Sequence, residues 1–182
     1  MAKKFVKSTL DIVGWLCNKA LTDKQILSSQ QLQNLLFLIQ MHHISKEGQV
    51  LIPSMFVCYQ DGFYEPTVEA ILSQKLPLLK LPILEQRVSL LLESVWQKYA
   101  HLSEKELLNF VTSLSCWKET YSAKEDVIIN PLDIASSFSL SISKDKNFSP
   151  SKIRLSQNGP VQVSPWRPRK LGNTNNLNKK ES

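Results

Sequence analysis

The 182-residue chain holds few of the residues from which catalytic, metal and disulfide sites are built: five glycines, three histidines and three cysteines. No glycine-rich phosphate loop and no G-x-S-x-G nucleophile setting occurs in it. Cys17, Cys58 and Cys116 form no C-x-x-C pair, which argues against a disulfide framework and a cysteine zinc site. Paired carboxylates such as Glu104 and Glu106 fit a solvated helix start. We therefore expect buried, reduced thiols, no metal, no cofactor and no enzymatic activity.

Long apolar runs are also missing. No segment approaches the roughly 20 apolar residues that a bilayer-spanning helix requires. Near the N-terminus, Lys7 and Asp11 interrupt the apolar residues and no small-residue cleavage site follows, so a signal peptide is not predicted. A cytoplasmic protein without membrane contact is the expectation.

The histidines do not suggest a metal site. His42 and His43 are neighbours, and adjacent helical residues point about 100° apart, so the two do not chelate one ion as a pair. A site that combines one of them with Cys58 is an open alternative. A partly buried structural histidine is the preferred interpretation. His101 stands alone in a loop.

Acidic residues become scarce in the last quarter of the chain. Residues 1–140 hold 13 Lys and Arg against 14 Asp and Glu, a net charge of −1, whereas residues 141–182 hold 9 against 2, a net charge of +7. From about Ser139 the composition shifts to Ser, Lys, Asn and Pro, and such a segment cannot bury enough apolar surface to offset its ordering entropy. We expect one domain over 1–140 and a disordered basic tail over 141–182.

The basic tail has three interpretations. It is a solvated tail, a weak and sequence-independent contact for nucleic acid in which Trp166 stacks on a base, or an export or docking signal that another protein recognises. Clustered lysines alone do not separate these interpretations.

Helical periodicity dominates the expected domain. Ser8 with Asp11 and Ser103 with Glu106 have the spacing of capping pairs, which predicts a helix start at each place. Pro66 suits the first position of a short helix through Leu72. Apolar residues recur at steps of three and four, and a late proline follows Asn130. Besides the short helix at Pro66, five helices are thus expected, at 8–20, 28–45, 84–99, 103–113 and from Pro131.

One interval breaks this pattern. Val50–Ile52 and Met55–Tyr59 are short and rich in β-branched or aromatic residues, and Asp61-Gly62 supplies a turn. We predict a small β hairpin around residues 50–59. The predicted fold class is mainly α: a single compact helical domain with a small β hairpin.

Three short blocks stand out in this domain: Leu32-Gln33-Asn34-Leu35-Leu36-Phe37, Tyr59-Gln60-Asp61-Gly62, and Leu107 to Trp117. Their leucines and aromatics mostly fit core positions. Phe63 and Tyr64 follow the glycine turn, where packing explains bulky aromatics less easily, so they are candidates for an interaction surface. The residues interpreted as structural are Leu32, Leu35, Leu36, Thr112 and Trp117.

The order and spacing of these blocks resemble the Panacea domain, also called the SocA-like or GepA-like domain. In that family the blocks read roughly L-Q-K-L-L-Y, A-W-x-x-G-P-V and L-x-x-x-T-H-x-x-x-P-W. The resemblance covers about residues 9–138. The chain departs from the family pattern at several positions: Asn34 replaces lysine, Tyr59 replaces tryptophan, Phe63 and Tyr64 replace proline and valine, and Ser113 and Cys116 replace histidine and proline.

The resemblance implies a bacterial or phage antitoxin, often encoded on prophages or mobile elements, that binds and silences a toxin without catalysis. The toxin would be encoded in the adjacent gene, and one family branch also delivers its toxin to a protease. We expect steric masking of the toxin through the turn and the second helix. The predicted contact residues are Tyr59, Asp61, Gly62, Phe63, Tyr64, Gln33 and Asn34.

An alternative belongs to a different class of protein. A secreted effector, or an orphan phage accessory protein, would use the same fold as an interaction scaffold. The basic tail would then serve as the export or docking signal.

Overall fold

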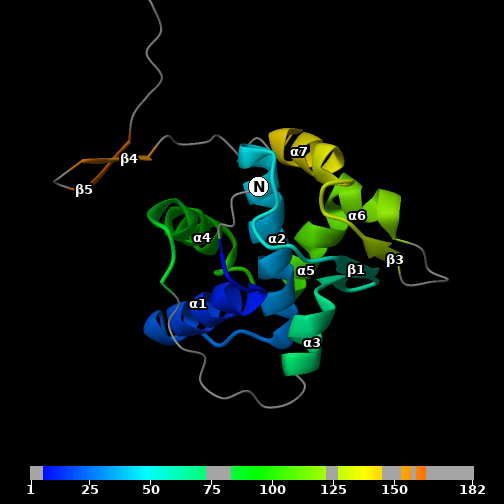
Figure 1. Ribbon diagram of the computed structural model, residues 1–182, viewed down its shortest axis with the longest axis horizontal. Coiled ribbons are helices and arrows are strands. Elements are labelled where there is room, and N and C mark those ends of the chain that lie inside the picture. The colour runs from blue at the N-terminus through cyan, green and yellow to red at the C-terminus, as the bar shows by residue number, and fades with distance from the viewer. Residues whose placement is uncertain (1–5, 73–82, 122–126, 145–152, 157–158, 163–182) are drawn as a thin grey trace, which may run out of the picture. The chain divides into compact units, whose positions relative to one another are not determined.

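The computed structural model describes residues 6–72, 83–121, 127–144, 153–156 and 159–162 (Figure 1). The chain divides into two units, Met1–Asp145 and Lys146–Ser182. The described part of the first unit is mainly helical with one three-stranded antiparallel sheet, which confirms the predicted fold class. The second unit contains a two-stranded antiparallel hairpin, β4 (Ile153–Ser156) and β5 (Gly159–Gln162).

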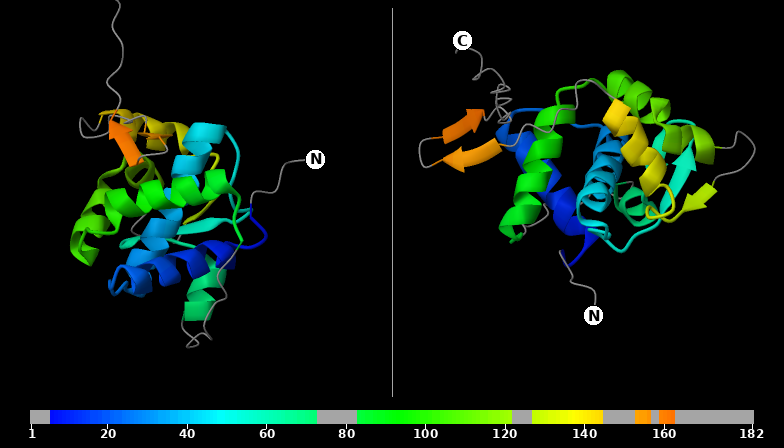
Figure 2. Two further views of the ribbon diagram at one scale, coloured as in Figure 1. Left: turned by 90° about the vertical axis from the view of Figure 1, so that its left-hand side faces the viewer. Right: turned by 90° about the horizontal axis from the view of Figure 1, so that it is seen from above.

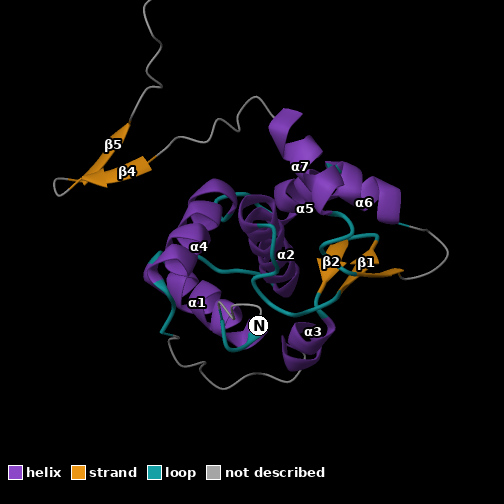
Figure 3. Cartoon of the chain, turned by 45° about the horizontal axis from the view of Figure 1, so that its top comes forward, coloured by secondary structure: helices purple, strands orange, loops and turns teal. Residues whose placement is uncertain are grey.

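Helix α2 (Ser29–Glu47) is the centre of the first unit. Helices α1 and α4 lie on one side of it, and the sheet, α3 and α6 lie on the other (Figures 1 and 3), a division that Figure 2 also shows from above. Its neighbours are β2 and the helices α1 (Thr9–Thr22), α3 (Pro66–Leu72), α4 (Gln86–Tyr99), α5 (Glu104–Ser113) and α7 (Ala135–Lys144).

The middle of α2, from Leu32 to Ile44, is buried around its whole circumference. Nearly every side chain from Leu32 to Ile44 is buried, as expected for a helix enclosed on all sides. Apolar steps of three and four predict burial of one helix face, so the burial of α2 is wider than that pattern indicates. Four polar side chains enter the core as a result: Gln33, Asn34, Gln40 and His43.

The helix starts predicted at Ser8, Ser103 and Pro66 are confirmed, whereas the start predicted at Pro131 is wrong, because residues 131–134 form a turn and α7 begins at Ala135. Ser8 Oγ accepts a hydrogen bond from Leu10 N and Asp11 Oδ2 accepts one from Ser8 N, at 3.1 and 3.0 Å, so α1 begins at Thr9. Ser103 and Glu106 form the same reciprocal box at the start of α5. Pro66 is the first residue of α3, where its missing N–H costs no helical hydrogen bond.

The hairpin lies later in the chain than predicted. Strands β1 (Phe56–Tyr59) and β2 (Gly62–Tyr64) are antiparallel and joined by the two-residue turn Gln60-Asp61. Val50–Ile52 is not a strand. The backbone N–H groups of Leu51 and Ile52 instead donate to Gln40 Oε1, each at 3.1 Å.

The third strand and one helix were not predicted. Strand β3 (Val127–Ile129) pairs with the other edge of β1, which gives the order β2-β1-β3. Helix α6 (Ser115–Thr120) follows α5 after Leu114. Both elements depend on contacts with segments far away in the sequence.

The C-terminal boundary of the helical domain lies beyond residue 140. Helix α7 begins at Ala135, after a turn at 131–134, and continues to Lys144. Ser141 Oγ accepts a hydrogen bond from the first amide of α6, Ser115 N, at 2.9 Å. The first unit thus includes residues that were assigned to the tail. Apart from β4 and β5, the remainder of the predicted disordered tail, Trp166 included, lies outside the described residues.

Among the helices that the structure describes, none combines the length and the apolar composition needed to cross a membrane.

Candidate interaction surface at the β1–β2 hairpin

Amide side chains of α2 hold the hairpin by its main chain. Gln30 Nε2 donates to Asp61 O at 2.8 Å. Gln33 Oε1 accepts from Glu65 N at 3.0 Å, while its Nε2 donates to Glu65 O at 3.3 Å. A side-chain amide has both a donor and an acceptor, so one glutamine satisfies both backbone groups of a residue. The hairpin is thereby fixed to the central helix.

Glu65 connects the end of the hairpin to α3. Its side chain is buried, with Oε2 accepting from Val68 N at 2.6 Å and Oε1 accepting from the hydroxyl of Ser54. These bonds satisfy a carboxylate that would otherwise be costly to bury, and they cap the first turn of α3.

Gly62 allows the closest approach between the hairpin and α2. Its φ is +121°, and a Cβ at this position would lie 2.2 Å from Asn34 Oδ1. The same Oδ1 accepts a long hydrogen bond of 3.5 Å from Phe63 N, and Asn34 Nδ2 is buried without a partner among the described residues. Only glycine suits this site, both for its conformation and for its size.

The inner face of the sheet belongs to the core. Successive residues of a strand point to opposite faces, and Phe56, Cys58 and Phe63 point inward. Phe37 of α2 stacks on Phe63 with 3.9 Å between ring centroids, and meets Phe56 edge-on at 5.6 Å. Aromatic packing of this kind fixes the register of the hairpin against the helix.

The outer face carries apolar and aromatic residues without complete cover. Val57 pairs with Tyr64 on one side and with Ile128 on the other, and Tyr59 lies two residues further along β1. Ile128 is 69% exposed, and Met55, just before β1, is 46% exposed. These side chains add apolar area to the outer face that another molecule can bury.

Four half-buried rings extend this face, and we call Tyr59, Tyr64, Trp117 and Tyr121 the aromatic surface. Tyr59 and Tyr64 meet nearly perpendicularly, with centroids 5.3 Å apart. Trp117 and Tyr121 stack at 4.4 Å. Trp117 Nε1 donates to Tyr59 O at 2.9 Å and so joins the two pairs. Tyrosine and tryptophan in this half-exposed state are the residues most often found at the energetic centre of protein interfaces.

Three carboxylates accompany the aromatic surface. Asp61 Oδ2 accepts a hydrogen bond from the Tyr64 hydroxyl at 2.9 Å. Burial, this hydrogen bond and the negative charges of Asp61, Glu69 and Glu104 together raise the pKa of Tyr64 far above its usual range. Tyr64 therefore stays protonated at any physiological pH, and its ring lies in a negative field.

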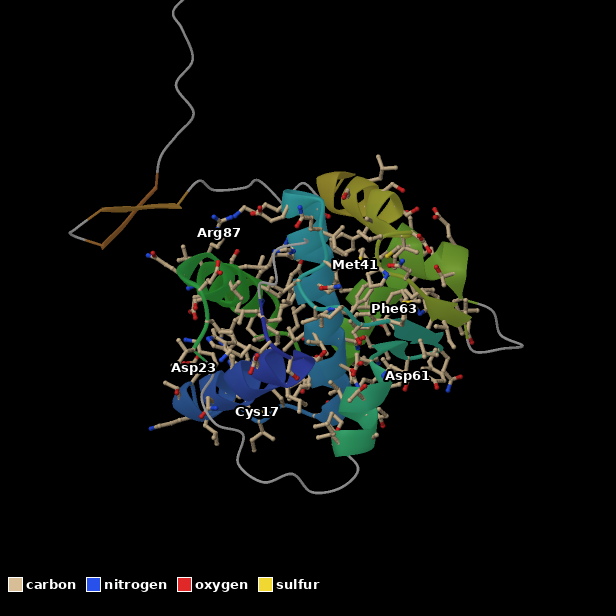
Figure 4. The ribbon with its side chains drawn as sticks, viewed as in Figure 1. Cys17, Asp23, Met41, Asp61, Phe63 and Arg87 are labelled. Carbon is tan, nitrogen blue, oxygen red and sulfur yellow. The ribbon has the colours of Figure 1, made fainter. Side chains whose placement is uncertain are left out.

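The predicted contact residues divide into two groups. The structure brings all seven together around the hairpin, but only some of them face outward; Figure 4 shows Phe63 toward α2 and Asp61 at the outer end of the hairpin. The half-buried group is Tyr59, Asp61 and Tyr64. The buried group is Gln33, Asn34, Gly62 and Phe63, so the prediction that these four face a partner is wrong; they hold the hairpin in place.

The residues interpreted as structural also differ in their placement. Leu32, Leu35 and Leu36 are buried as predicted. Thr112 Oγ1 donates to Leu108 O within α5, at 2.9 Å. Trp117 is only half-buried and contributes to the aromatic surface. Sequence interpretation missed Tyr121, Ile128, Glu69 and Glu104; the run of β-branched residues at 127–129 was the available signal for the third strand.

The two adjacent histidines have hydrogen-bonded structural settings. His43 Nδ1 lies 2.8 Å from Gln49 O, and His42 Nε2 lies 3.0 Å from the Tyr99 hydroxyl. Burial, with a smaller contribution from the charge of Lys98, lowers the pKa of His42 to about 4. His42 is thus neutral near pH 7. Within the described residues, no three His, Cys, Asp or Glu side chains are grouped to hold a metal ion.

The thiols are poorly suited to chemistry. Cys58 and Cys116 are buried, and burial raises the pKa of each to about 12. Cys17 is half-buried, and burial raises its pKa as well. A thiol reacts and binds metals as the thiolate, so these three groups remain weak nucleophiles at neutral pH.

No family model, curated protein or solved structure matches this chain. The resemblance to the Panacea domain therefore stays a prediction that rests on the three sequence blocks.

Proposed function

We propose that this chain is a non-catalytic binding protein of the antitoxin type, which silences a toxin by covering it. The family resemblance motivates the toxin as the partner, and the adjacent gene is where that toxin is sought. The alternative family mechanism, delivery of the toxin to a protease, uses the same first step of direct binding.

The observation that supports a binding role is the aromatic surface. Tyr59, Tyr64, Trp117 and Tyr121 keep part of each ring exposed while their backbones are held by the core. Rings that are already fixed lose little conformational entropy when a partner covers them. Ile128 and Met55 extend the apolar area next to them.

In this mechanism the buried motif residues act indirectly. Gln33, Asn34 and Gly62 set the position of the hairpin relative to α2, and the hairpin presents Tyr59 and Tyr64. Affinity would rest on the exposed rings as anchors, because a few aromatic residues commonly supply most of the binding free energy.

Co-expression with the product of the adjacent gene tests the proposal. We expect the adjacent product to be toxic alone, to be silenced by this chain, and to co-purify with it. Replacement of Tyr64 by Ala should weaken the complex at least about tenfold. Leu90→Ala is the matched control, because Leu90 is 49% exposed but belongs to α4, on the other side of α2. Absence of a toxic neighbour and of any co-purifying neighbour product would refute the antitoxin role.

The charge of the tail favours a second candidate. Residues 141–182 carry +7, which suits an export or docking signal on an effector or accessory protein. Removal of residues 146–182 should then abolish export from the producing cell, because the helical unit ends at Asp145. Export that persists after this deletion removes the idea.

A further inference from the structure

Three elements next to Tyr64 each carry one carboxylate: the β1–β2 turn and α3 flank β2 in the sequence, and α5 packs against β2. Asp61 comes from the β1–β2 turn, Glu69 from α3 and Glu104 from the first turn of α5. All three act on the Tyr64 hydroxyl through their negative charge, and Asp61 is also hydrogen-bonded to it at 2.9 Å. Asp61 and Glu69 lie within five residues of Tyr64 in the sequence, whereas Glu104 is 40 residues away, so the tertiary fold adds the charge of Glu104 to a local pair.

Little within the described part of the chain neutralises these carboxylates. The two ion pairs formed there join Lys19 to Asp23 and to Glu93, on the far side of α2. Glu69 Oε2 accepts one neutral hydrogen bond, from Gln33 Nε2 at 3.2 Å. Glu69 and Glu104 are both exposed, so they remain open to a cationic partner.

Aromatic faces and carboxylates together suit one side chain better than any other. The planar guanidinium of arginine stacks on tyrosine and tryptophan rings and binds carboxylates through two parallel hydrogen bonds. A lysine ammonium makes the same ion pair but is more strongly hydrated and lacks the planar stacking surface.

We propose that the aromatic surface, with the carboxylates of Asp61, Glu69 and Glu104 beside it, is a docking site for an arginine-bearing basic segment of a partner protein. This inference deepens the proposed function and rests on it for the role of the surface. It specifies the chemistry of the partner: arginine side chains stack on the rings while their charge is balanced by the three carboxylates.

A fluorescein-labelled hexa-arginine peptide is the probe, titrated into the full-length protein and followed by fluorescence anisotropy. We expect tighter binding than for hexa-lysine, and affinity that falls as salt rises. The double variant Glu69→Gln/Glu104→Gln should lower the affinity at least about fivefold. Glu47→Gln is the matched control, since Glu47 is an exposed carboxylate at the opposite end of α2, and it should change nothing.

The location of the bound peptide is read by NMR. The indole N–H of Trp117 and the amide of Tyr64 should shift on titration, whereas the indole N–H of Trp96, which donates to Asp23 Oδ2 at 2.8 Å on the other side of α2, should not. Equal affinity in the double variant and in Glu47→Gln, no binding at millimolar peptide, or shifts confined to other regions would each overturn the inference.

Failure of this inference can be distinguished from failure of the antitoxin role. If the neighbouring product co-purifies and its affinity is unchanged by Glu69→Gln/Glu104→Gln, the antitoxin role holds and the arginine site is wrong. If hexa-arginine binds at the aromatic surface and no neighbouring product does, the arginine site holds and the antitoxin role is wrong.

Discussion

Aromatic and charged side chains lie on both sides of helix α2, but they are enclosed and paired on one side and partly exposed on the other. On the α1–α4 side, Trp96 donates to Asp23 at 2.8 Å, meets Trp15 edge-on at 6.2 Å, and lies near Lys19, which pairs with Asp23 and Glu93 at 3.3 Å each. On the hairpin side, Trp117 and Tyr121 stack on each other, and the Tyr64 hydroxyl donates to Asp61, a carboxylate that forms no ion pair within the described residues. The first side satisfies its charges internally, whereas the second leaves both rings and charge available.

That difference separates a tryptophan enclosed by the core from one that keeps part of its ring exposed. Trp96 is 4% exposed, while Trp117 is half-buried. A closed set of ion pairs and buried rings contributes to stability, but a partly exposed set mainly offers binding free energy to another molecule.

The largest expected change in stability comes from a substitution that disrupts the attachment of the hairpin to α2. Gly62→Ala forces a Cβ against Asn34 Oδ1 and a side chain onto a backbone with φ +121°. We expect the free energy of unfolding to fall by about 3–4 kcal/mol, measured by urea denaturation. Gly48→Ala is the matched control: its φ is +68° with no atom within 4 Å of the added Cβ, so the loss should be about 1–2 kcal/mol. Equal losses in the two variants would contradict the close approach at Gly62.

The second prediction concerns pH on the α4 side. Because the folded chain lowers the pKa of His42 from 6.5 to about 4, the unfolded chain binds the proton more readily between these values. The free energy of unfolding should therefore decrease as pH falls from 6.5 to 4, by about 2–3 kcal/mol from this group. His42→Gln should remove that part of the slope. Urea denaturation at each pH measures both proteins. Identical pH profiles for the unsubstituted chain and His42→Gln would show that His42 does not cause the loss of stability.

The third prediction compares the two tryptophans directly. Trp96→Phe removes a buried indole and its bond to Asp23, so the free energy of unfolding should fall by about 2 kcal/mol. Trp117→Phe loses the bond to Tyr59 O in a half-exposed setting and should cost about 1 kcal/mol. Partner or hexa-arginine affinity should respond in the reverse order. A larger loss of affinity in Trp96→Phe than in Trp117→Phe would place the binding surface on the α1–α4 side instead.

The smallest effect tests the C-terminal boundary of the helical unit. Truncation after Leu140 removes Ser141, whose hydroxyl accepts from Ser115 N, and should cost about 1 kcal/mol. Truncation after Asp145 keeps all of α7 and should change the free energy of unfolding by less than about 0.5 kcal/mol. Thermal and urea unfolding of both truncated chains against the full chain distinguish them; equal stability of the two would place the boundary at 140 after all.

The helix starts were predictable because their chemistry is local. A serine with an acidic residue three positions later satisfies its own backbone at Ser8 and Ser103, and a proline at residue 66 fits the first turn. The hairpin was also readable in part, since Asp61-Gly62 between two apolar runs is a known turn signal. The strands were predicted at 50–59, but they lie at 56–64. The error arose because the turn at Asp61-Gly62 was placed after the hairpin, whereas it connects the two strands.

The candidate site was less accessible from the sequence. The first and middle blocks of the motif do meet, but Phe63 faces inward onto Phe37 and Asn34 faces Gly62, which no spacing rule distinguishes from an outward placement. A shift of one residue in strand register exchanges the two faces, so the identity of the exposed rings depends on pairing across the sheet.

By itself, the sequence determined the mainly helical class, the capped helix starts, the absence of common catalytic signatures and the charge contrast between residues 1–140 and 141–182, because these follow from composition and from neighbours within a few positions. Only the tertiary structure decided which aromatics remain exposed, that α2 is buried on all sides, and that Glu104, 40 residues away in the chain, adds its charge to those of Asp61 and Glu69 at Tyr64. Those features depend on long-range packing, in which each element is enclosed or left open by segments distant in the chain.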